Sequence, residues 1–305
     1  MKEQNIVNIP NTKIAEVIGV TEGSVRKAKN NFKAGRSKRY LDYLEAFKKG
    51  ISIKEYDELK MKEEINKIGK LYKDNDKNQD ANIIGVVNFK GGVGKSTIAV
   101  LMKEYLPDSL IVNLDYQEAE KINPENSTCD FPILKEQEES LTLEEYIETM
   151  TMPSEDEHIP TYKNIILDTQ GSEFNEDFDS ILHKITHFVV PMTPGRRSFE
   201  KTKMTIETLL DFGANPNAKW CIVVNNYVDD KQFEEEKIRI EREIKPLLGD
   251  KLVCISSLKN SRIVPKMENE GIDLSKLSLR EKQQVKVFKQ RVEKLNRELA
   301  EKLFN

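Results

Sequence analysis

The chain has 305 residues, 38% of them hydrophobic and 33% charged, and a formal net charge of −4. This length accommodates one α/β domain of about 220 residues and a smaller module. The small net charge does not by itself indicate a strongly charged partner such as nucleic acid. No apolar run reaches the length of a membrane-spanning helix, and the first residues lack the apolar core of a signal peptide. The three cysteines have no metal-ligand spacing, which predicts reduced thiols. We therefore expect a cytoplasmic protein.

Residues 1–48 have the pattern of a small helix-turn-helix domain. Apolar and small residues recur at helical spacing on both sides of Gly19, which permits a tight turn. Thr21 is placed to cap the second helix. Residues 11–40 contain eight Lys or Arg and only two Asp or Glu, and such a local basic patch indicates nucleic-acid binding.

The predicted second helix presents polar and basic side chains of the types that contact phosphates and base edges in a major groove. These candidate DNA-binding residues are Thr21, Ser24, Arg26, Lys27, Asn30 and Lys33. Short helical hairpins also produce such a pattern by chance, and the alternative is a purely structural helical domain. The agreement between helical rhythm and local charge favours DNA binding.

Residues 49–80 connect this domain to the rest of the chain. A charged helix is predicted over 51–72, and the stretch 73–80 has no apolar residue, which indicates a linker. Over 81–305, apolar runs alternate with amphipathic helices, which predicts an α/β domain whose mostly parallel sheet is covered by helices on both faces. The predicted strands are 83–89, 109–114, 163–168, 186–191, 219–226 and 252–256.

The run FKGGVGKST at 89–97 lies between a predicted buried strand and a predicted helix over 97–105. Its glycines allow the backbone to wrap a polyphosphate with successive N–H groups turned inward. Lys95 is placed to reach the β- and γ-phosphates, and Ser96 to ligate Mg²⁺. The run therefore predicts a nucleoside triphosphate site, and its nucleotide-binding residues are Lys90, Gly91, Gly92, Val93, Gly94, Lys95, Ser96 and Thr97.

A second lysine, Lys90, precedes the glycines. A solvated loop charge is the simpler explanation, but this lysine is also placed to reach a nucleotide held by a facing subunit, as an arginine finger does. The pattern KGGVGKST resembles the deviant phosphate loop of the ParA/MinD superfamily, which includes the nitrogenase iron protein. The resemblance implies a P-loop NTPase fold of the deviant Walker A type and an ATP-sandwich dimer. Lys90 would then be the signature lysine, catalytic together with Lys95.

Two further segments resemble motifs of that superfamily. The strand before Asp115 is similar to its D-x-D-P-Q motif, which implies that Asp115 orients and polarises the attacking water. Asn113 and Tyr116 stand where the family has aspartate and proline, so weaker metal binding or slower turnover is expected. The strand before Asp168 resembles Walker B, which implies that this carboxylate holds Mg²⁺ through a water.

Later strands resemble the family more loosely. The strand over 188–194 ends in a proline-containing turn, and the strand over 222–226 ends in two asparagines. Asn226 aligns slightly better than Asn225 with the family asparagine that helps to hold the base. A simple turn at the end of the strand explains both asparagines nearly as well.

The C-terminal segment 279–304 has an apolar stripe at helical spacing. MinD-like proteins end in a membrane-targeting amphipathic helix, but here the polar face mixes glutamates with lysines, which favours packing on the α/β domain. A DNA surface and a solvated face explain the basic residues at the start of this segment and in the stretch before it equally well. These residues are Lys259, Arg262, Lys266, Lys282, Lys286 and Lys289.

Together with the basic N-terminal domain, the resemblance implies a ParA-type DNA partition ATPase, of plasmid origin, with ATP and Mg²⁺ as cofactors. The implied partners are a second copy of the chain, operator or nucleoid DNA, and a ParB-like centromere-binding protein that stimulates slow hydrolysis. No membrane partner is expected, and the protein would be cytoplasmic and nucleoid-associated, with a capacity to repress its own operon. The alternatives are a MinD-like positioning ATPase at a membrane and a transcriptional regulator that uses ATP as a switch.

Overall fold

The computed structural model describes residues 9–35, 37–73, 81–115, 128–131, 134, 141–152, 161–171, 176–261 and 279–304. Residues 74–80 of the predicted linker lie outside these ranges, as do Tyr116, Arg262 and Lys266, and only the backbone of Lys282 is described. The chain divides into two compact units, residues 1–67 and 68–305.

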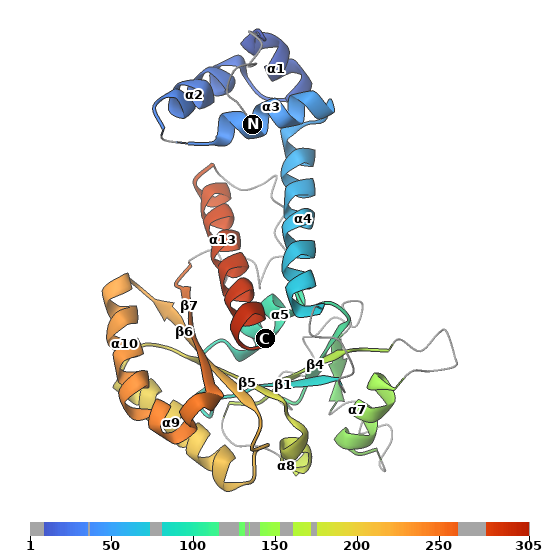
Figure 1. Ribbon diagram of the computed structural model, residues 1–305, viewed down its shortest axis with the longest axis vertical. Helices are drawn as coiled ribbons and strands as arrows, with labels where there is room; N and C mark the ends of the chain where they lie inside the picture. Colours follow the sequence, from blue (N-terminus) through green and yellow to red (C-terminus); the bar gives the residue numbers. More distant parts are fainter. Residues whose placement is uncertain are drawn as a thin grey trace. The chain divides into compact units, whose positions relative to one another are not determined.

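The N-terminal unit is built from three short helices and the first part of a longer one (Figure 1). These helices are α1 (Asn11–Ile18), α2 (Glu22–Lys33), α3 (Arg39–Lys49) and α4 (Ile53–Lys73). α1 ends at Gly19, which has a left-handed φ of 70°. Thr21 caps α2 as predicted, since its Oγ1 accepts a hydrogen bond from Ser24 N at 3.2 Å.

The helices of this unit enclose a small apolar core and are joined by ion pairs. The buried residues are Ile14, Ala15, Ile18, Val25, Ala28, Tyr40, Leu44, Ala46 and Tyr56. Arg39 of α3 donates to both carboxylate oxygens of Asp57 on α4, at 2.5 and 2.6 Å. Lys60 of α4 pairs in turn with Asp42 of α3 at 2.7 Å. A bidentate pair of this kind fixes geometry as well as charge, so the first part of α4 belongs to this unit.

The second unit contains a seven-stranded sheet in which every pairing is parallel. Its strands are β1 (Asn82–Val86), β2 (Ser109–Asn113), β3 (Thr128–Asp130), β4 (Asn164–Asp168), β5 (His187–Met192), β6 (Lys219–Tyr227) and β7 (Leu252–Lys259), in the spatial order β3-β2-β4-β1-β5-β6-β7. The chain leaves β1 toward one edge and leaves β4 toward the other. Parallel sheets bind ligands at such a switch point, beyond the carboxyl ends of the strands.

Helices cover both faces of this sheet, as the predicted α/β fold requires (Figure 1). α5 (Lys95–Lys103) and α13 (Leu279–Lys302) pack on one face, whereas α7 (Leu143–Thr151), α8 (Glu176–Ile181), α9 (Arg196–Asp211) and α10 (Asp230–Glu243) pack on the other. The short segments α11 (Lys245–Leu248), η4 (Leu182–Lys184) and η5 (Gly249–Lys251) complete the described elements. Within the core, Phe188 of β5 stacks on Trp220 of β6 with ring centroids 4.1 Å apart.

The C-terminal helix α13 buries its apolar stripe against β7 and α5. The buried residues are Val285, Phe288, Val292, Leu295, Leu299, Ala300, Leu303 and Phe304. Asn296 Nδ2 donates to Leu101 O of α5 at 3.1 Å, and the ring of Phe304 stacks on His187 of β5. The predicted packing of this helix on the α/β domain is therefore confirmed. No helix in the described part of the chain is long and apolar enough to cross a membrane.

Candidate functional site

The loop between β1 and α5 has the backbone geometry of a phosphate cradle. Gly92 and Gly94 have φ angles of 69° and 91°, in the left-handed region that favours glycine. A Cβ at Gly94 would also collide with the side-chain amide of Asn225. The N-cap residue of α5 is Gly94, which has no side chain to cap the helix, and the start of a helix is a place where backbone N–H groups bind anions.

Polar side chains of α9 and the backbone of β5 hold the first part of this loop. The buried Asn88 donates to Pro191 O and to Thr202 Oγ1, both at 2.8 Å, and accepts from Lys90 N at 2.8 Å. Thr205 Oγ1 accepts from the N–H that follows Asn88, at 2.9 Å. These bonds fix where the loop starts relative to the end of β5.

The lysine predicted to reach the phosphates lies inside the site. Lys95 opens α5 and is 8% exposed, whereas Ser96 is exposed and Thr97 is half-buried. The segment after β4 passes close by, because a Cβ at Gly171 would lie 3.0 Å from Gly91 Cα and 3.4 Å from Lys95 Nζ. Glycine at position 171 therefore permits the two loops and the lysine amine to meet.

The two predicted carboxylates lie at the carboxyl ends of β4 and β2. Asp168 is the buried last residue of β4, and it pairs in register with Val86 of β1 and Asn113 of β2. Asp115 follows β2 by two residues and is partly exposed. Both carboxylates thus share one edge of the sheet with the phosphate loop, which begins just after β1.

Asn113 stands where the resemblance leads us to expect an aspartate. It is 1% exposed, its Oδ1 accepts from Asp115 N at 3.0 Å, and its Nδ2 has no hydrogen-bond partner among the described residues. The amide oxygen therefore holds the backbone at Asp115 as an aspartate would. It does so without a second negative charge beside Asp168. The slower turnover expected from this replacement stays a prediction.

These residues fit a nucleoside triphosphate with Mg²⁺. The left-handed glycines leave space that a Cβ would fill, and Lys95 at the start of α5 complements phosphate charge. The Ser96 hydroxyl and the Asp168 carboxylate are oxygen donors of the kind that Mg²⁺ prefers, shared with substrate phosphates. Their roles as ligands stay predictions.

Lys90 lies at the outer edge of the loop and is half-buried. Its Nζ donates to Thr193 Oγ1 at 2.8 Å, and this hydroxyl is 3.1 Å from Ser198 Oγ. Lys90 is therefore partly ordered by a hydroxyl of the loop after β5. Its contact with a facing subunit stays a prediction.

The two asparagines at the end of β6 differ in position. Asn225 is buried, and its Nδ2 donates to Val93 O of the phosphate loop at 2.8 Å. Asn226, which we favoured for base binding, is exposed and has a left-handed φ of 60°. Side chains alternate along β6, so Asn225 lies on the same face of the sheet as Val223. This alternation is the sequence signal that would have placed Asn225, and not Asn226, beside the phosphate loop. Base binding by Asn226 remains a prediction.

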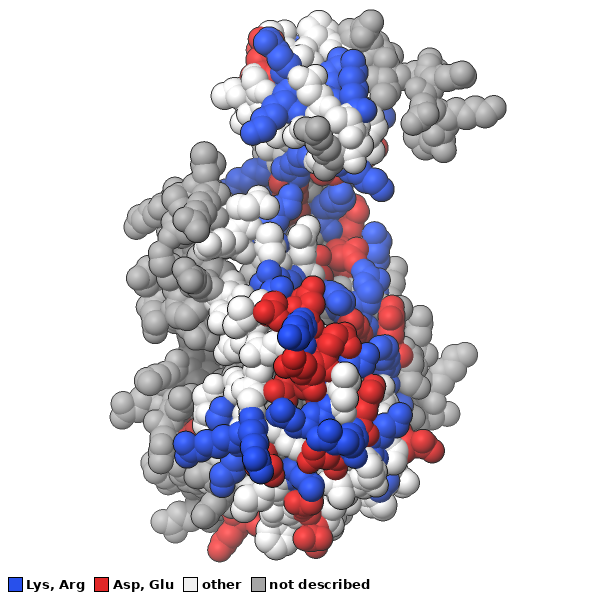
Figure 2. All heavy atoms as spheres, turned by 90° about the vertical axis from the view of Figure 1, so that its left-hand side faces the viewer, with Lys and Arg blue, Asp and Glu red and all other residues white. Residues whose placement is uncertain are grey.

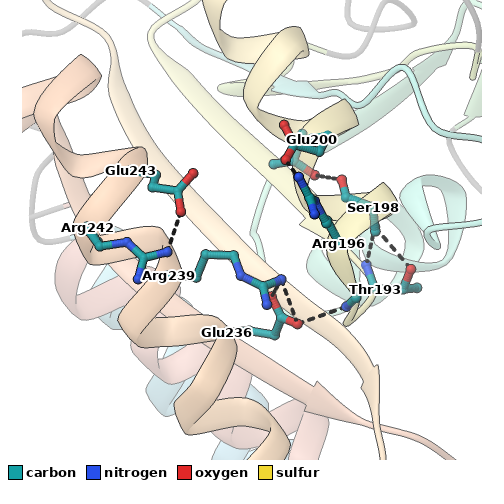
Figure 3. Close-up of polar contacts among 10 residues, drawn as sticks. Thr193, Arg196, Ser198, Glu200, Glu236, Arg239, Arg242 and Glu243 are labelled. Carbon is teal, nitrogen blue, oxygen red and sulfur yellow. Dashed lines mark hydrogen bonds and ion pairs between the residues drawn. The ribbon is translucent and has the colours of Figure 1, made fainter.

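The loop after β5 contains Thr193, which accepts the hydrogen bond from Lys90. Two hydrogen bonds fix the backbone of this loop (Figure 3). Ser198 Oγ accepts from Thr193 N at 3.1 Å, and Glu236 of α10 accepts from Gly195 N at 2.8 Å. The Glu236 side chain is 6% exposed and pairs with Arg239 at 3.1 Å. Glu236 therefore anchors this loop to α10, and sequence reasoning missed the contact because it joins α10 to a loop 41 residues earlier in the chain.

The six DNA-binding candidates all lie on α2 or at its start. Arg26, Lys27, Asn30 and Lys33 are exposed, while the hydroxyls of Thr21 and Ser24 are 2.8 Å apart at the helix cap. Arg26 pairs with Glu22 at 2.7 Å on the exposed surface, where such pairs are weak. In Figure 2 most of the charged side chains visible on this unit, at the top of the view, are basic.

Comparison with known proteins identifies one family. The sequence profile of the CobQ/CobB/MinD/ParA nucleotide binding domain matches residues 84–274, a segment that contains the loop, both carboxylates and Asn225. No curated protein sequence matches the chain.

Three similar solved structures have low sequence identity to the chain. The pNOB8 ParA structure is 14% identical over 72% of this chain and 97% of that protein, with a TM-score of 0.51. A plasmid partition protein from Borrelia burgdorferi is 15% identical over 70% and 100%, with a TM-score of 0.38. An ATP complex of an McdA variant from Cyanothece is 12% identical over 73% and 97%, with a TM-score of 0.46. The first of these likenesses supports the fold.

Proposed function

The chain belongs to the family of the CobQ/CobB/MinD/ParA nucleotide binding domain, and on this premise we propose that it is an ATP-dependent DNA partition ATPase. ATP would join two copies in a sandwich dimer that binds DNA, and hydrolysis would release it. A ParB-like partner protein would stimulate this hydrolysis. The single observation that carries the proposal is the phosphate loop with Lys90 held at its outer edge by Thr193.

Each residue of the site has a role in this proposal. The N–H groups after Gly94 and the Lys95 amine hold the phosphates, and Ser96 and Asp168 hold the metal. Bound Mg²⁺ would neutralise charge on the phosphate oxygens. Asp115, whose backbone Asn113 fixes, orients a water for attack, and Lys90 stabilises charge on the nucleotide of the facing copy. Asn226 is proposed to contact the base.

DNA binding is assigned to α2 and its cap. The exposed basic side chains Arg26, Lys27 and Lys33 would neutralise backbone phosphates, and Asn30 would read a base edge. The ATPase unit would control this binding by bringing two copies of α2 together. Through this module the protein would also bind an operator and repress its own operon.

The test compares wild type with Lys90→Ala by sedimentation equilibrium, in Mg²⁺ with ADP or with the slowly hydrolysed ATPγS. We expect wild type to dimerise with ATPγS but not with ADP, and to hydrolyse ATP slowly with stimulation by DNA. Lys90→Ala should remain monomeric and lose at least about tenfold in stimulated rate, because its cation no longer reaches the facing nucleotide. Lys231→Ala removes an exposed lysine of α10 and serves as the matched control. Normal dimerisation and turnover in Lys90→Ala would overturn the sandwich proposal.

A second candidate is a transcriptional regulator that uses ATP as a switch with little turnover. The buried Asn113 in place of an aspartate favours it. Wild type that dimerises with ATP and binds DNA, yet hydrolyses no ATP when DNA and partner are present, would select this candidate. A MinD-like membrane role has less support, because the apolar stripe of α13 is buried against β7 and α5.

A further inference from the structure

A groove beside the phosphate loop gathers four cationic side chains. It has a volume of about 660 Å³ and is lined by Lys90 and Gly91 of the phosphate loop together with Arg196, Arg197 and Lys201 of α9. No acidic residue lines it. β5 and β1 are neighbours in the sheet, which is why the loop after β5 and the start of α9 stand beside the phosphate loop.

The positive charge of this groove is poorly compensated. Arg197 and Lys201 make no ion pair with any described residue. Arg196 approaches Glu200 at 3.7 Å, but both side chains are largely exposed, and such pairs contribute little. Lys90 donates to a neutral hydroxyl. The described residues therefore leave close to four positive charges around one hollow.

This arrangement works against the stability of the free chain. Four like charges around one groove repel one another. Arg196 and Arg197 also occupy the first turn of α9, which has no acidic residue and no side-chain cap, although cations are disfavoured there by the helix dipole. The backbone of the groove is nevertheless fixed, because Glu236 and Ser198 accept hydrogen bonds from the loop that leads into α9 (Figure 3). Such pre-formed positive charge is suited to an anionic ligand.

We propose that this groove binds the terminal phosphates of a nucleoside triphosphate, with Arg197 and Lys201 acting beside Lys90. The groove shares Lys90 and Gly91 with the phosphate loop. A triphosphate bound at that loop would therefore lie next to the groove. The guanidinium of Arg197 can donate to two phosphate oxygens at once, and Lys201 adds a point charge. The phosphates belong either to the chain's own nucleotide or to that of a second copy. The inference rests on the proposed function.

The test measures the affinity of the full chain for ATPγS and for ADP, each with Mg²⁺. Arg197→Ala should weaken ATPγS binding about tenfold or more and ADP binding less than twofold, because only the triphosphate extends to the groove. Lys201→Ala should show a smaller loss, and Arg197→Lys should recover part of it. Arg242→Ala removes an exposed arginine of α10 that pairs with Glu243 outside the groove (Figure 3), and it should bind both nucleotides as wild type does.

Protein concentration distinguishes the two sources of phosphate. If the loss in Arg197→Ala appears in dilute monomer, the groove binds the chain's own nucleotide. If it appears only at concentrations where wild type dimerises, the groove binds the nucleotide of the second copy. Either result supports the inference.

Four outcomes would overturn it. Equal losses for ATPγS and ADP would assign Arg197 a general structural effect. Unchanged nucleotide affinities with loss of DNA binding would assign the groove to a nucleic-acid backbone. Wild-type nucleotide binding with no effect of Arg197→Ala would remove this inference alone, whereas a wild type that binds no ATPγS would remove the proposed function as well.

Discussion

Gly94 is the residue on which the backbone of the phosphate loop depends most. Its φ of 91° is one that residues with a side chain rarely adopt, and a Cβ there would strike the Asn225 amide. That amide donates to Val93 O at 2.8 Å, so any displacement of it also releases the loop. A side chain at position 94 would therefore cause both backbone strain and a collision with Asn225.

We expect Gly94→Ala to destabilise the fold by about 2–4 kcal/mol, from backbone strain and the collision together, and to weaken ATPγS binding at least about tenfold. Gly213→Ala is the matched control, since Gly213 has a similar φ of 86° but no atom within 4 Å of its added Cβ. It should cost only the strain, about 1–2 kcal/mol, and leave ATPγS affinity unchanged. Urea unfolding and nucleotide titration measure both quantities. Equal effects of the two substitutions would show that the contact with Asn225 is unimportant.

Sequence alone located the residues of the loop and both carboxylates, because these occupy fixed places at the ends of strands. It favoured Asn226 for base binding, which stays a prediction, and motif alignment alone did not indicate that Asn225 contacts the phosphate loop. It also did not single out Thr193 or Arg197, whose relation to Lys90 arises only because β5 lies next to β1 in the sheet. Contacts that depend on strand order carry no local signal.

At the scale of elements, His187 joins β5 to the segment that follows α13. This side chain is 7% exposed, its ring stacks on Phe304 at 4.5 Å, and its Nδ1 is 2.7 Å from Thr186 Oγ1. Burial, and then the charge of Lys219 on β6, lower the pKa of His187 to about 3. The imidazole is therefore neutral in the folded chain at physiological pH.

Because the unfolded chain binds a proton at His187 more readily than the folded chain does, this residue stabilises the fold above its unfolded pKa of 6.5. The stabilisation is lost as pH falls from about 6.5 toward 3. Between pH 7 and pH 5 we expect His187 to contribute about 2 kcal/mol to the loss of unfolding free energy. His187→Phe keeps a stacking ring without this titration, so its stability should fall less over the same interval. Urea unfolding at several pH values measures the two slopes, and parallel slopes would contradict the assignment.

Six of the seven strands were predictable as apolar runs, and the long periodic stripe of α13 predicted its packing on the sheet. β3 was missed because its three residues are too few to show a period. The division into units at residue 67 falls inside α4. The sequence showed a helix there but carried no sign that its first turns are tied to α3 by Arg39 and Asp57.

At the scale of the molecule, a basic helical unit and a nucleotide unit share one chain. If ATP joins two copies in a dimer, both α2 helices can bind the same DNA molecule. Once the first helix is bound, the second binds within the same complex. Linked binding of this kind raises apparent affinity by a factor of about 10². The gain depends on nucleotide, although α2 itself contains no nucleotide-binding residue.

We therefore expect ATPγS with Mg²⁺ to raise the affinity of wild type for duplex DNA about 100-fold, and Lys90→Ala to lack this rise. Lys27→Ala should weaken DNA binding with and without nucleotide and reduce the slope of log affinity against log salt by about 0.9. Lys54→Ala removes an equally positive, 84% exposed side chain of α4 and serves as the control. Fluorescence anisotropy over a salt series measures these values. A DNA affinity independent of ATPγS would contradict the coupling.

The stacked pair Phe188–Trp220 has a practical consequence, because Trp220 is the only tryptophan of the chain. Its indole is completely buried in the sheet unit, and residues 1–67 contain none. Tryptophan emission therefore monitors the melting of one unit, whereas far-ultraviolet circular dichroism sums both. A difference between the two signals would reveal, in the unmodified chain, whether the halves unfold together or in turn.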